Sequence, residues 1–496
     1  MQINLEPETR AIIGRLKALL EHQELRGYIV GGFLRDLVMG RQVRDLDIAL
    51  DGDVVAFGRE FACELEAKPV LLDNTNGTMR LILPETGANC RQIDVSSTHG
   101  DLGSDLALRD FTLNAMACDI VAHSWDAPNT LAIDIMDPLD GLKDIRARLV
   151  RATGSNVFRH DAIRLLRAVR LASELGFAID DATEGLIKRD AHLIQGEAGE
   201  RVREELLRIL KQGNTDTTIL YMQELNLITA VIPELAPSVG LEQHSDHQWN
   251  VFEHSVRSMA AMDFLLRCGS WSHASINVLE DVSWDECLAD HFQAPVSSAS
   301  NHRELDKFAA LLHDIAKPQT QTISPSGKLR FYGHPQEGAL VVEKILERLR
   351  FSTGEKRLVT TVVRHHLRPV QLGGDDALPS KRAVYHLIRD LGEALPDTLF
   401  FSLADHLATR GDRLDLTNWR HHANIVNYVM AESAHTNSAP PTKLLNGYDL
   451  QRELGLKPGL RLGMVLAELR EAQAVGEISN RDEALRYAIG LLNEQG

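Results

Sequence analysis

Residues 28–50, YIVGGFLRDLVMGRQVRDLDIAL, place two glycines before a short helical pattern and then two aspartates around one leucine. Because successive side chains alternate across a β-strand, Asp45 and Asp47 in LDIAL should point to the same side. Two carboxylates that close repel each other unless a cation lies between them, and Mg²⁺ is the usual cation that proteins hold with one or two carboxylates plus substrate phosphates. Two turn aspartates at a strand edge are the alternative for an isolated Asp-x-Asp.

Neighbouring residues favour the metal-binding interpretation. Gly31 and Gly32 allow backbone N–H groups to approach a phosphate at the start of the following helix. Asp94 in RQIDV lies on another strand pattern and would supply a third carboxylate. A phosphate-binding turn followed by paired metal ligands suits nucleotidyl transfer, in which one metal activates the attacking hydroxyl and the other neutralises the triphosphate.

Length and composition are typical of a globular protein with several domains. The chain has 496 residues, which at about 100–200 residues per domain suggests three or four domains. The five cysteines are scattered without CxxC spacing, so we expect reduced thiols and neither a disulfide framework nor a zinc ribbon. The start of the chain lacks a signal-peptide pattern, and no uncharged run approaches ~18 residues. These features predict a cytoplasmic protein that does not span a membrane.

The net charge of −17 argues against a protein that binds nucleic acid over its whole surface. A local basic stretch is still present, because residues 146–170 contain seven arginines and one acidic residue, Asp161. The stretch is either a solvated helix face or a groove for phosphates. The seven are Arg146, Arg148, Arg151, Arg159, Arg164, Arg167 and Arg170.

Strand patterns are confined to the first 145 residues, in LDIAL, VLLD, MRLILP and RQIDVSS, between turns rich in Gly, Asn and Pro. An amphipathic pattern predicts a helix over 8–25, and FLRDLVMG predicts a helix closed by Gly40. The amino-terminal part is therefore expected to be a mixed α/β unit.

After Asp144 the patterns are helical, first at about 160–176 and 199–212 and again from about 303 to 430. Residues 269–302 are rich in serine and have no periodicity, which predicts a mobile loop. TNSAPPTKLLNG, residues 436–447, reads as a linker before a last helical piece.

Five motifs in order resemble the class II tRNA nucleotidyltransferase and bacterial poly(A) polymerase family, within the polymerase-β-like superfamily. GGFLRDLVMGRQVRDLDIA is similar to motif A of that family, and about 180 residues carry the whole set. The others are LRDFTLNAMA (108–117, motif B), DPLDGLKDI (137–145, motif C), HDAIRLLRAVRLASELGF (160–177, motif D) and GERVREELLRIL (199–210, motif E).

The resemblance implies an α+β fold, with a nucleotidyltransferase head built on a mixed sheet and all-helical neck, HD and tail domains after it. The tail would contact tRNA. The implied ranges are 1–145 for the head, 146–235 for the neck, 236–435 for the HD domain with its insertion at about 269–302, and 440–496 for the tail.

The resemblance also assigns roles to individual residues. Asp45, Asp47 and Asp94 would be catalytic, with Mg²⁺ held by Asp45 and Asp47. Arg109, Asp110 and Asn114 would contact the incoming sugar, although Asp110 could also be a helix N-cap. Asp161 and Arg164, spaced to share one helix face, would read the base edge of CTP or ATP; a surface ion pair is the alternative. The full nucleotide-binding set is Gly31, Gly32, Arg35, Arg109, Asp110, Asn114, Asp161, Arg164 and Arg167. Arg167 would serve either the triphosphate or the fold.

Two features depart from the family pattern. The residue before Asp161 is usually glutamate and here is His160, which weakens any role for that first position of motif D. The family's flexible loop between motifs A and B is usually long, whereas only fourteen residues separate Asp94 from Arg109. A short loop resembles the CC-adding branch, which cannot switch to ATP.

A second constellation of histidines and aspartates resembles the HD phosphohydrolase superfamily. A His-Asp pair ends the apolar helix FAALLHDIAK, and further His and Asp residues lie on other helical patterns, an arrangement that can hold one or two divalent metals such as Mn²⁺, Ni²⁺ or Co²⁺. A structural HD fold without activity is the alternative. The resemblance assigns His254, His313, Asp314 and Asp405 to a first metal, and His334 and His366, with His365 as the alternative to His366, to a second.

The sequence therefore predicts an enzyme that adds C, or C and A, from CTP and ATP to the 3′ end of tRNA by two-metal nucleotidyl transfer. A poly(A) polymerase shares all five motifs and is the first alternative, although a basic tail would favour it and the ending LRYAIGLLNEQG is not basic. An HD phosphohydrolase with a nucleotide-binding head is the second alternative. An inactive RNA-binding module is disfavoured because every expected metal carboxylate is present.

Overall fold

The computed structural model describes the chain except for a few short segments. The described residues are 1–43, 45–73, 77–84, 91–98, 100–125, 131–243, 247–325, 327–373, 377–438 and 443–494. The chain divides into two compact units, which are described separately: unit 1 holds residues 1–205 and 222–231, and unit 2 holds 206–221 and 232–496. Within the described ranges, no helix has the length and apolar character needed to cross a membrane.

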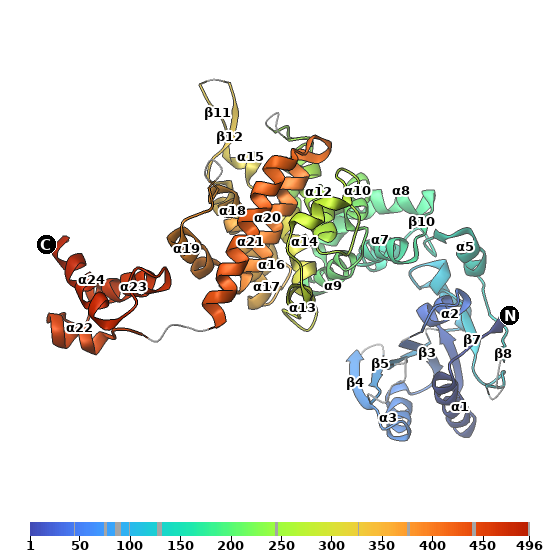
Figure 1. Ribbon diagram of the computed structural model, residues 1–496. Helices are drawn as coiled ribbons and strands as arrows, with labels where there is room; N and C mark the ends of the chain where they lie inside the picture. The colour runs from blue at the N-terminus through green and yellow to red at the C-terminus, as the bar shows by residue number, and fades with distance from the viewer. Residues whose placement is uncertain are drawn as a thin grey trace. The chain divides into compact units, whose positions relative to one another are not determined.

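Unit 1 contains a six-stranded mixed sheet in the order β4-β5-β6-β3-β2-β7 (Figure 1). The β3–β6 pair is parallel, and the other neighbours are antiparallel. Leu46, Ile48 and Leu50 of β3 are fully buried, which is the alternation expected of a strand with one core-facing side. The strands are β2 (Arg26–Val30), β3 (Asp45–Asp51), β4 (Lys68–Asp73), β5 (Thr78–Ile82), β6 (Gln92–Ser97) and β7 (Ala117–Asp119).

The two predicted helices of the head are present, α1 at Pro7–His22 and α2 at Gly31–Val38, and a third that was not predicted, α3, spans Val54–Glu64. α1 ends three residues before the predicted limit, because Glu24 adopts a left-handed conformation (φ 54°) and the chain enters β2 at Arg26. Gly40 has φ 68° just after α2, as expected for a glycine that closes a helix.

Further along unit 1 the chain is largely helical, but short strands also occur after Asp144, where none was predicted. β9 (Leu149–Val150) pairs in parallel with β10 (Ala178–Ile179). Two-residue strands carry no alternation, so no sequence pattern could reveal them. The remaining elements are β1 (Gln2–Ile3), α4 (Leu102–Ala107), η1 (Thr112–Asn114), β8 (Leu131–Ala132), α5 (Gly141–Ala147), α6 (Val157–His160), α7 (Arg164–Leu175), α8 (Asp181–Asp190), η2 (Ala191–Gly196) and α11 (Leu227–Val231). α9 (Gly199–Leu210) begins in unit 1 and ends in unit 2, and most of α10 (Thr215–Glu224) belongs to unit 2.

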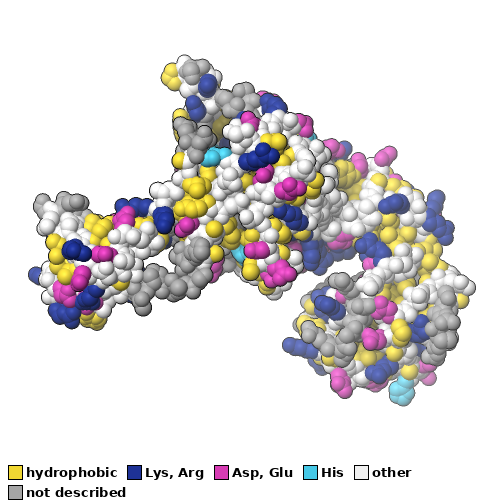
Figure 2. Space-filling view, in the orientation of Figure 1, with side chains coloured by type: hydrophobic (Ala, Val, Ile, Leu, Met, Phe, Trp, Pro, Cys, Tyr) yellow, Lys and Arg dark blue, Asp and Glu magenta, His cyan; other side chains and the backbone are white. Residues whose placement is uncertain are grey.

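The arginine-rich stretch is only partly solvated. Figure 2 shows Lys and Arg side chains over the region of α5 and β10, where Arg146 and Arg148 are exposed. Most of the other arginines are neutralised by carboxylates of the same unit, so the stretch is not a row of free cations. The ion pairs are Arg151 with Asp144 and Asp180, Arg159 with Asp190, Arg164 with Asp161, Arg167 with Asp110, and Arg170 with Glu174 and Glu205.

Unit 2 is a helical assembly in which α12 (Val251–Leu265) packs against α14 (His302–Leu312) and α20 (Leu395–Arg410). A short hairpin, β11 (Gln321–Ile323) with β12 (Leu329–Phe331), interrupts the predicted helical block. The other elements are η3 (Pro233–Ser238), η4 (Ile276–Asp281), α13 (Glu286–Gln293), α15 (Lys317–Thr320), α16 (His334–Arg348), α17 (Thr353–His365), α18 (Arg368–Gln371), α19 (Lys381–Leu391), η5 (Gly392–Ala394), η6 (Gly411–Arg413), α21 (Leu416–Ser438), α22 (Gly447–Leu454), α23 (Leu460–Ala474) and α24 (Arg481–Glu494).

The prediction of a patternless mobile loop at residues 269–302 is wrong. The segment contains η4 and α13, and its Val278, Leu288 and Phe292 are buried in the same apolar cluster as Trp419 of α21. The Trp419 indole N–H donates to the Val278 carbonyl at 3.2 Å. The apolar residues of α13 stand four apart within only eight helical residues, too short a run to show periodicity among the surrounding serines.

The predicted linker at 436–447 begins later than expected, because α21 continues to Ser438. Residues 439–442 of the linker lie outside the described residues. Leu445, at its far end, is buried in a small apolar cluster with Leu450, Val465 and Leu469 of α22 and α23. The carboxy-terminal helices thus have a core of their own.

Candidate active site and metal centre

The sheet of unit 1 brings the predicted catalytic carboxylates to one face. Asp47 of β3 is the direct register partner of Asp94 on the parallel strand β6, and Asp45 lies two residues before Asp47. The intervening Leu46 and its register partner Ile93 are fully buried on the opposite face. The three carboxylates therefore share the more exposed face, as the alternation predicted.

Electrostatics make this face suitable for a cation. Burial, and next the charge of Asp94, raise the pKa of Asp47 to about 6, while the charge of Arg109 and a hydrogen bond from the Gly32 backbone lower it. Carboxylates that destabilise each other's charge in this way are suitable ligands for a hard divalent cation such as Mg²⁺. The donor set therefore fits the metal that the sequence implies.

Two arginines partly neutralise the negative charge of the carboxylate face, which is the side of the sheet that carries Asp45, Asp47 and Asp94. Arg80 of β5 donates to Asp94 through Nε at 2.8 Å and Nη2 at 2.7 Å, and Arg109 Nη2 lies 3.3 Å from Asp105 Oδ2. The sequence analysis did not single out Arg80, although its strand pattern could have revealed it, because Arg80 is directly opposite Asp94 in the antiparallel β5–β6 pair. A metal at Asp94 would compete with this guanidinium.

A glycine is required at position 31 by its close approach to Asp47. Gly31 has φ 70°, and a Cβ there would lie 2.8 Å from Asp47 Oδ2. A side chain at position 31 would therefore be strained and would also collide with the carboxylate. Binding of a phosphate by Gly31 and Gly32 stays a prediction; the contact that the structure does contain is the one from Gly32 to Asp47.

The residues of motif B form a buried network that joins three elements. Asp110 Oδ2 accepts from Arg167 of α7 at 2.9 and 2.6 Å, and Asp110 Oδ1 accepts from the Phe111 N–H and Asn114 Nδ2. Arg35 of α2 donates to Asn114 Oδ1 at 2.8 Å. Although burial acts in the opposite direction, Arg167 holds the pKa of Asp110 below its ordinary value. Phe111, and not Asp110, occupies the N-cap position of η1.

Asp161 and Arg164 do not lie on one helix, contrary to the prediction. α6 ends at His160, Asp161 is extended (φ −157°), and α7 begins at Arg164. Asp161 Oδ2 lies 3.9 Å from Arg164 Nε and accepts from Arg201 Nη2 of α9 at 2.9 Å. The pair is still adjacent, and Arg201 is a partner that the sequence analysis missed although motif E contains it.

Arg164 retains binding capacity. Its Nη1 is buried and has no hydrogen-bond partner in the described part of the chain. A buried guanidinium N–H without an acceptor is costly unless a ligand supplies one. The acceptor atoms on the edge of a nucleotide base could satisfy this donor.

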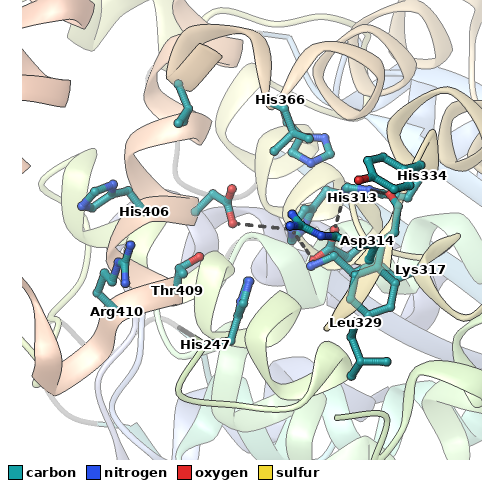
Figure 3. A pocket seen from close by; sticks show the side chains of 16 residues that line it. His247, His313, Asp314, Lys317, Leu329, His334, His366, His406, Thr409 and Arg410 are labelled. Atoms are coloured by element: carbon teal, nitrogen blue, oxygen red, sulfur yellow. Dashed lines mark hydrogen bonds and ion pairs between the residues drawn. The ribbon is translucent and has the colours of Figure 1, made fainter. Parts of the chain in front are cut away.

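Unit 2 contains a cavity of about 470 Å³ lined by predicted HD residues (Figure 3). His313 and Asp314 follow α14, His334 begins α16, His366 follows α17, and Asp405 belongs to α20. His365 is not among the lining residues, so His366 is the member of the pair that faces the cavity. His254 of α12 is fully buried, with Nε2 at 2.9 Å from Asp405 Oδ1.

The imidazoles are oriented as metal ligands. The Nδ1 atoms of His313, His334 and His366 each donate to the backbone carbonyl three residues earlier, at 2.9, 2.7 and 2.7 Å. Such hydrogen bonds fix the ring and leave Nε2 available for a metal. The ligand atoms of His254, His313 and Asp405 lie within 4.8 Å of one another, and so do those of His313, Asp314 and His366.

The charge states fit a divalent cation as well. Burial, and then the charges of His313 and His334, lower the pKa of His366 to about 3, so its ring is neutral as a metal ligand must be. Lys317, which the sequence analysis missed, places Nζ 2.5 Å from Asp314 Oδ2. His247 also lines the cavity, and burial lowers its pKa to about 3.

Comparison with known proteins gives a consistent picture. Family models for the poly A polymerase head domain, the probable RNA and SrmB-binding site of polymerase A, and the HD domain match residues 27–151, 176–239 and 286–410. The chain is 30% identical to the A-adding tRNA nucleotidyltransferase of Deinococcus radiodurans over 465 residues, 92% of this chain and 94% of the relative. It is also 30% identical to the CC-adding tRNA nucleotidyltransferase of Thermus thermophilus over 470 residues, 93% and 92% of the two chains.

A solved structure of a CCA-adding enzyme with CTP has the same fold, with a TM-score of 0.64 and 21% sequence identity over 98% of this chain and 96% of that one. The expected α+β architecture, with a mixed-sheet head followed by a largely helical region that includes an HD domain, is confirmed. Since relatives of this identity span nearly the whole length of both chains, the chain belongs to the class II tRNA nucleotidyltransferase family.

Proposed function

We propose that this tRNA nucleotidyltransferase adds C residues from CTP to the 3′ end of tRNA without a template, and that it stops after the second C. The observation that carries the proposal is the short connection between Asp94 and Arg109. Six of its residues form α4, whose Asp105 pairs with Arg109. Asp101 caps α4 by accepting from the Ser104 N–H at 2.8 Å. So short and anchored a connection leaves little chain to reshape the site for ATP.

The residues have distinct roles in this proposal. Asp45, Asp47 and Asp94 would hold Mg²⁺, which when bound supplies charge neutralisation for the triphosphate and activation of the attacking 3′-hydroxyl. Arg109, near the carboxylate face, would contact the incoming nucleotide, and Arg164 would donate its orphaned Nη1 to an acceptor on the base edge. Asp161, held by Arg201, would accept from the exocyclic amine of cytosine.

The remaining divisions of the chain are part of the same proposal. Residues 146–235 would act as the neck that presents the base-reading side chains, and residues 440–496 would contact the tRNA. The relatives include both A-adding and CC-adding enzymes, so likeness alone favours neither specificity.

The specificity is tested with tRNA ending at position 73, at C and at CC, each offered CTP or ATP separately. We expect CTP to be incorporated on the first two substrates and ATP addition to the CC end to be at background, since only ATP use requires the site to reshape. Labelled-nucleotide incorporation resolved on a gel measures both. Efficient ATP addition to the CC end would overturn the proposal; a single A would indicate A or CCA addition, and a long A tract would indicate poly(A) synthesis.

Base selection is tested with Asp161→Ala. Loss of one partner in a base-edge pair typically costs about 1–3 kcal/mol, so the preference for CTP over UTP should fall by roughly ten- to a hundredfold. Competition assays with both nucleotides measure the ratio. Glu197→Gln is the matched control, because Glu197 also pairs with Arg201, and the amide oxygen can still accept from the Ala162 N–H that Glu197 binds at 3.1 Å. A lower rate with an unchanged ratio would remove Asp161 from base reading.

We also propose that the HD cavity hydrolyses phosphate esters, including 2′,3′-cyclic nucleotides, with a divalent transition metal. The supporting observation is that the Nδ1 atoms of His313, His334 and His366 all donate to backbone carbonyls, which leaves Nε2 for a metal. Asp314 and Asp405 line the same cavity. Burial would raise the pKa of Asp405, but its hydrogen bond with His254, together with the charge of His313, lowers it, so the carboxylate is ionised at neutral pH.

A further inference from the structure

A second cluster of histidine and aspartate lies in unit 2 away from the HD cavity. His302 begins α14 and Asp397 lies in the first turn of α20, whereas the HD residues lie at the other end of α14, just after it in the case of His313, and further along α20 in the case of Asp405. At a rise of about 1.5 Å per residue, His302 and His313 are roughly 16 Å apart along the helix axis. His291 of α13 completes the cluster. None of these residues was assigned by the sequence analysis.

The two imidazoles converge on Asp397. His291 Nε2 lies 2.9 Å from Asp397 Oδ2, and His302 Nδ1 lies 2.6 Å from Asp397 Oδ1. The ligand atoms of the three residues lie within 4.8 Å of one another. Asp397 is fully buried, while the two rings are partly exposed, at 23% and 16% of their side chains. Solvent therefore reaches the imidazoles, and the carboxylate lies behind them.

A fourth group, Asp306, contacts Asp397. It lies on α14 one helical turn after His302, and its side chain is completely buried. Neither of its carboxyl oxygens accepts from an N–H or hydroxyl group among the residues that the structure describes, and its partner is the Asp397 carboxylate, with which it forms a hydrogen bond when one proton lies between them. Burial, and then the proximity of Asp397, raise its pKa well above the ordinary value. A buried carboxyl group next to a second carboxylate is costly unless a cation or a proton is shared between them.

We propose that His291, His302 and Asp397 form a second metal site, distinct from the HD cavity, that takes a borderline transition-metal ion of the Zn²⁺ class, with Asp306 as the partner that orients Asp397. Two imidazoles and one carboxylate are a donor set that suits Zn²⁺, and because both rings are partly exposed, water can supply the fourth ligand. Mg²⁺ and Ca²⁺ prefer oxygen ligands and would be poor occupants.

Metal entry requires only a small expansion of the cluster. Around a tetrahedral ion with bonds of about 2.0 Å, neighbouring ligand atoms are roughly 3.3 Å apart. The two imidazole–carboxylate distances of 2.9 and 2.6 Å are those of direct hydrogen bonds, so the ligands would separate by less than about 1 Å.

The consequence of such a site is structural. His291 belongs to the 269–302 segment, His302 to the start of α14 and Asp397 to α20, so one ion would fasten that segment to two core helices. The role of the ion would be to hold residues 269–302 in place, and not to take part in nucleotide addition or hydrolysis.

The proposal is tested by zinc stoichiometry of the full chain, measured by elemental analysis after loading with ZnCl₂ and gel filtration. We expect His302→Ala to lose one equivalent relative to wild type. The exposed His192 is the matched control, and His192→Ala should keep the wild-type value. In His313→Ala, which disables the HD cavity, zinc should still bind to the second site. An unchanged stoichiometry in His302→Ala, or no zinc bound by His313→Ala, would overturn the proposal.

A nearly isosteric variant separates metal binding from folding. Asp306→Asn removes the buried carboxyl group, so in EDTA its melting temperature should equal or exceed that of wild type. Its zinc affinity at this site should fall by about tenfold or more, and the zinc-induced rise in melting temperature should be smaller than in wild type. A lower melting temperature in EDTA together with an undiminished zinc effect would show that Asp306 is an ordinary structural residue and would sink the proposal.

Discussion

Asp47→Asn should lower nucleotide incorporation by about 1,000-fold or more, and the protein should stay folded. Loss of a partner one shell away from a metal typically costs about 10–100-fold, so loss of a carboxylate that holds the ion should cost more. Incorporation of labelled CTP into tRNA measures the rate. Asp51→Asn is the matched control, because Asp51 ends the same strand and is exposed. A folded Asp47→Asn enzyme with wild-type activity would falsify the assignment of Asp47 to catalysis.

Although Asp47→Asn should nearly abolish activity, it should preserve or raise the stability of the fold at pH 8. The pKa of Asp47 is about 6 in the folded chain against an ordinary 3.8, so the ionised carboxylate destabilises the fold above pH ~6 and not below pH ~4. At 1.36 kcal/mol per pKa unit, this cost is at most about 3 kcal/mol. Melting curves in EDTA should therefore show Asp47→Asn at or above wild type at pH 8, with the difference vanishing near pH 4. A Tm well below wild type at pH 8 would contradict the electrostatic account.

His313→Ala should reduce hydrolysis of 2′,3′-cyclic nucleotides by the HD cavity to background, with Mn²⁺, Ni²⁺ or Co²⁺ added. His313 Nε2 lies 3.0 Å from Asp314 and 3.7 Å from Asp405, so its loss removes a ligand common to both candidate metal groups. Phosphate release measures hydrolysis, and CTP incorporation by the same preparation should change less than about twofold, since the cavity lies within unit 2.

Neighbouring histidines provide the control for this prediction. His366→Ala should also lose hydrolysis, whereas His365→Ala should retain it, because only His366 lines the cavity. Equal losses in both variants would point to damage of α17 and not to a missing ligand. If the wild-type protein hydrolyses none of these esters with any of the three ions, the HD region has a structural role alone.

Most of the carboxylate face can be predicted from the sequence, because strand alternation is visible within each short segment. Alternation in LDIAL and RQIDV determines which side of each strand carries the carboxylates, and the register of β3 and β6 places Asp47 beside Asp94. The helix break at Asp161 is not predictable in this way, since residues 160–176 have continuous helical periodicity. The break coincides with an ion pair to Arg201, forty residues away, and such a tertiary contact leaves no trace in a local pattern.

The His291–His302–Asp397 cluster escaped notice for the same reason. His302 and Asp306 stand four residues apart on one helix, which is a recognisable spacing, but their partners come from two other helices and carry no motif. The wrong assignment of 269–302 as a loop also removed His291 from consideration. Short helices embedded in serine-rich sequence are stabilised by packing, here against Phe400 and Trp419, and not by their own periodicity.

The Arg167–Asp110 pair has a mechanical consequence for specificity. Arg164 and Arg167 are one turn apart on α7, so the guanidinium that we propose reads the base belongs to a helix held by two short hydrogen bonds to Asp110, just before η1. Any rotation of α7 that redirects Arg164 must either move Asp110 with it or break a buried ion pair, and breaking such a pair costs about 3–5 kcal/mol. Under this proposal an arginine held in place suits one base, and reading a second base would require additional free energy to rotate the helix.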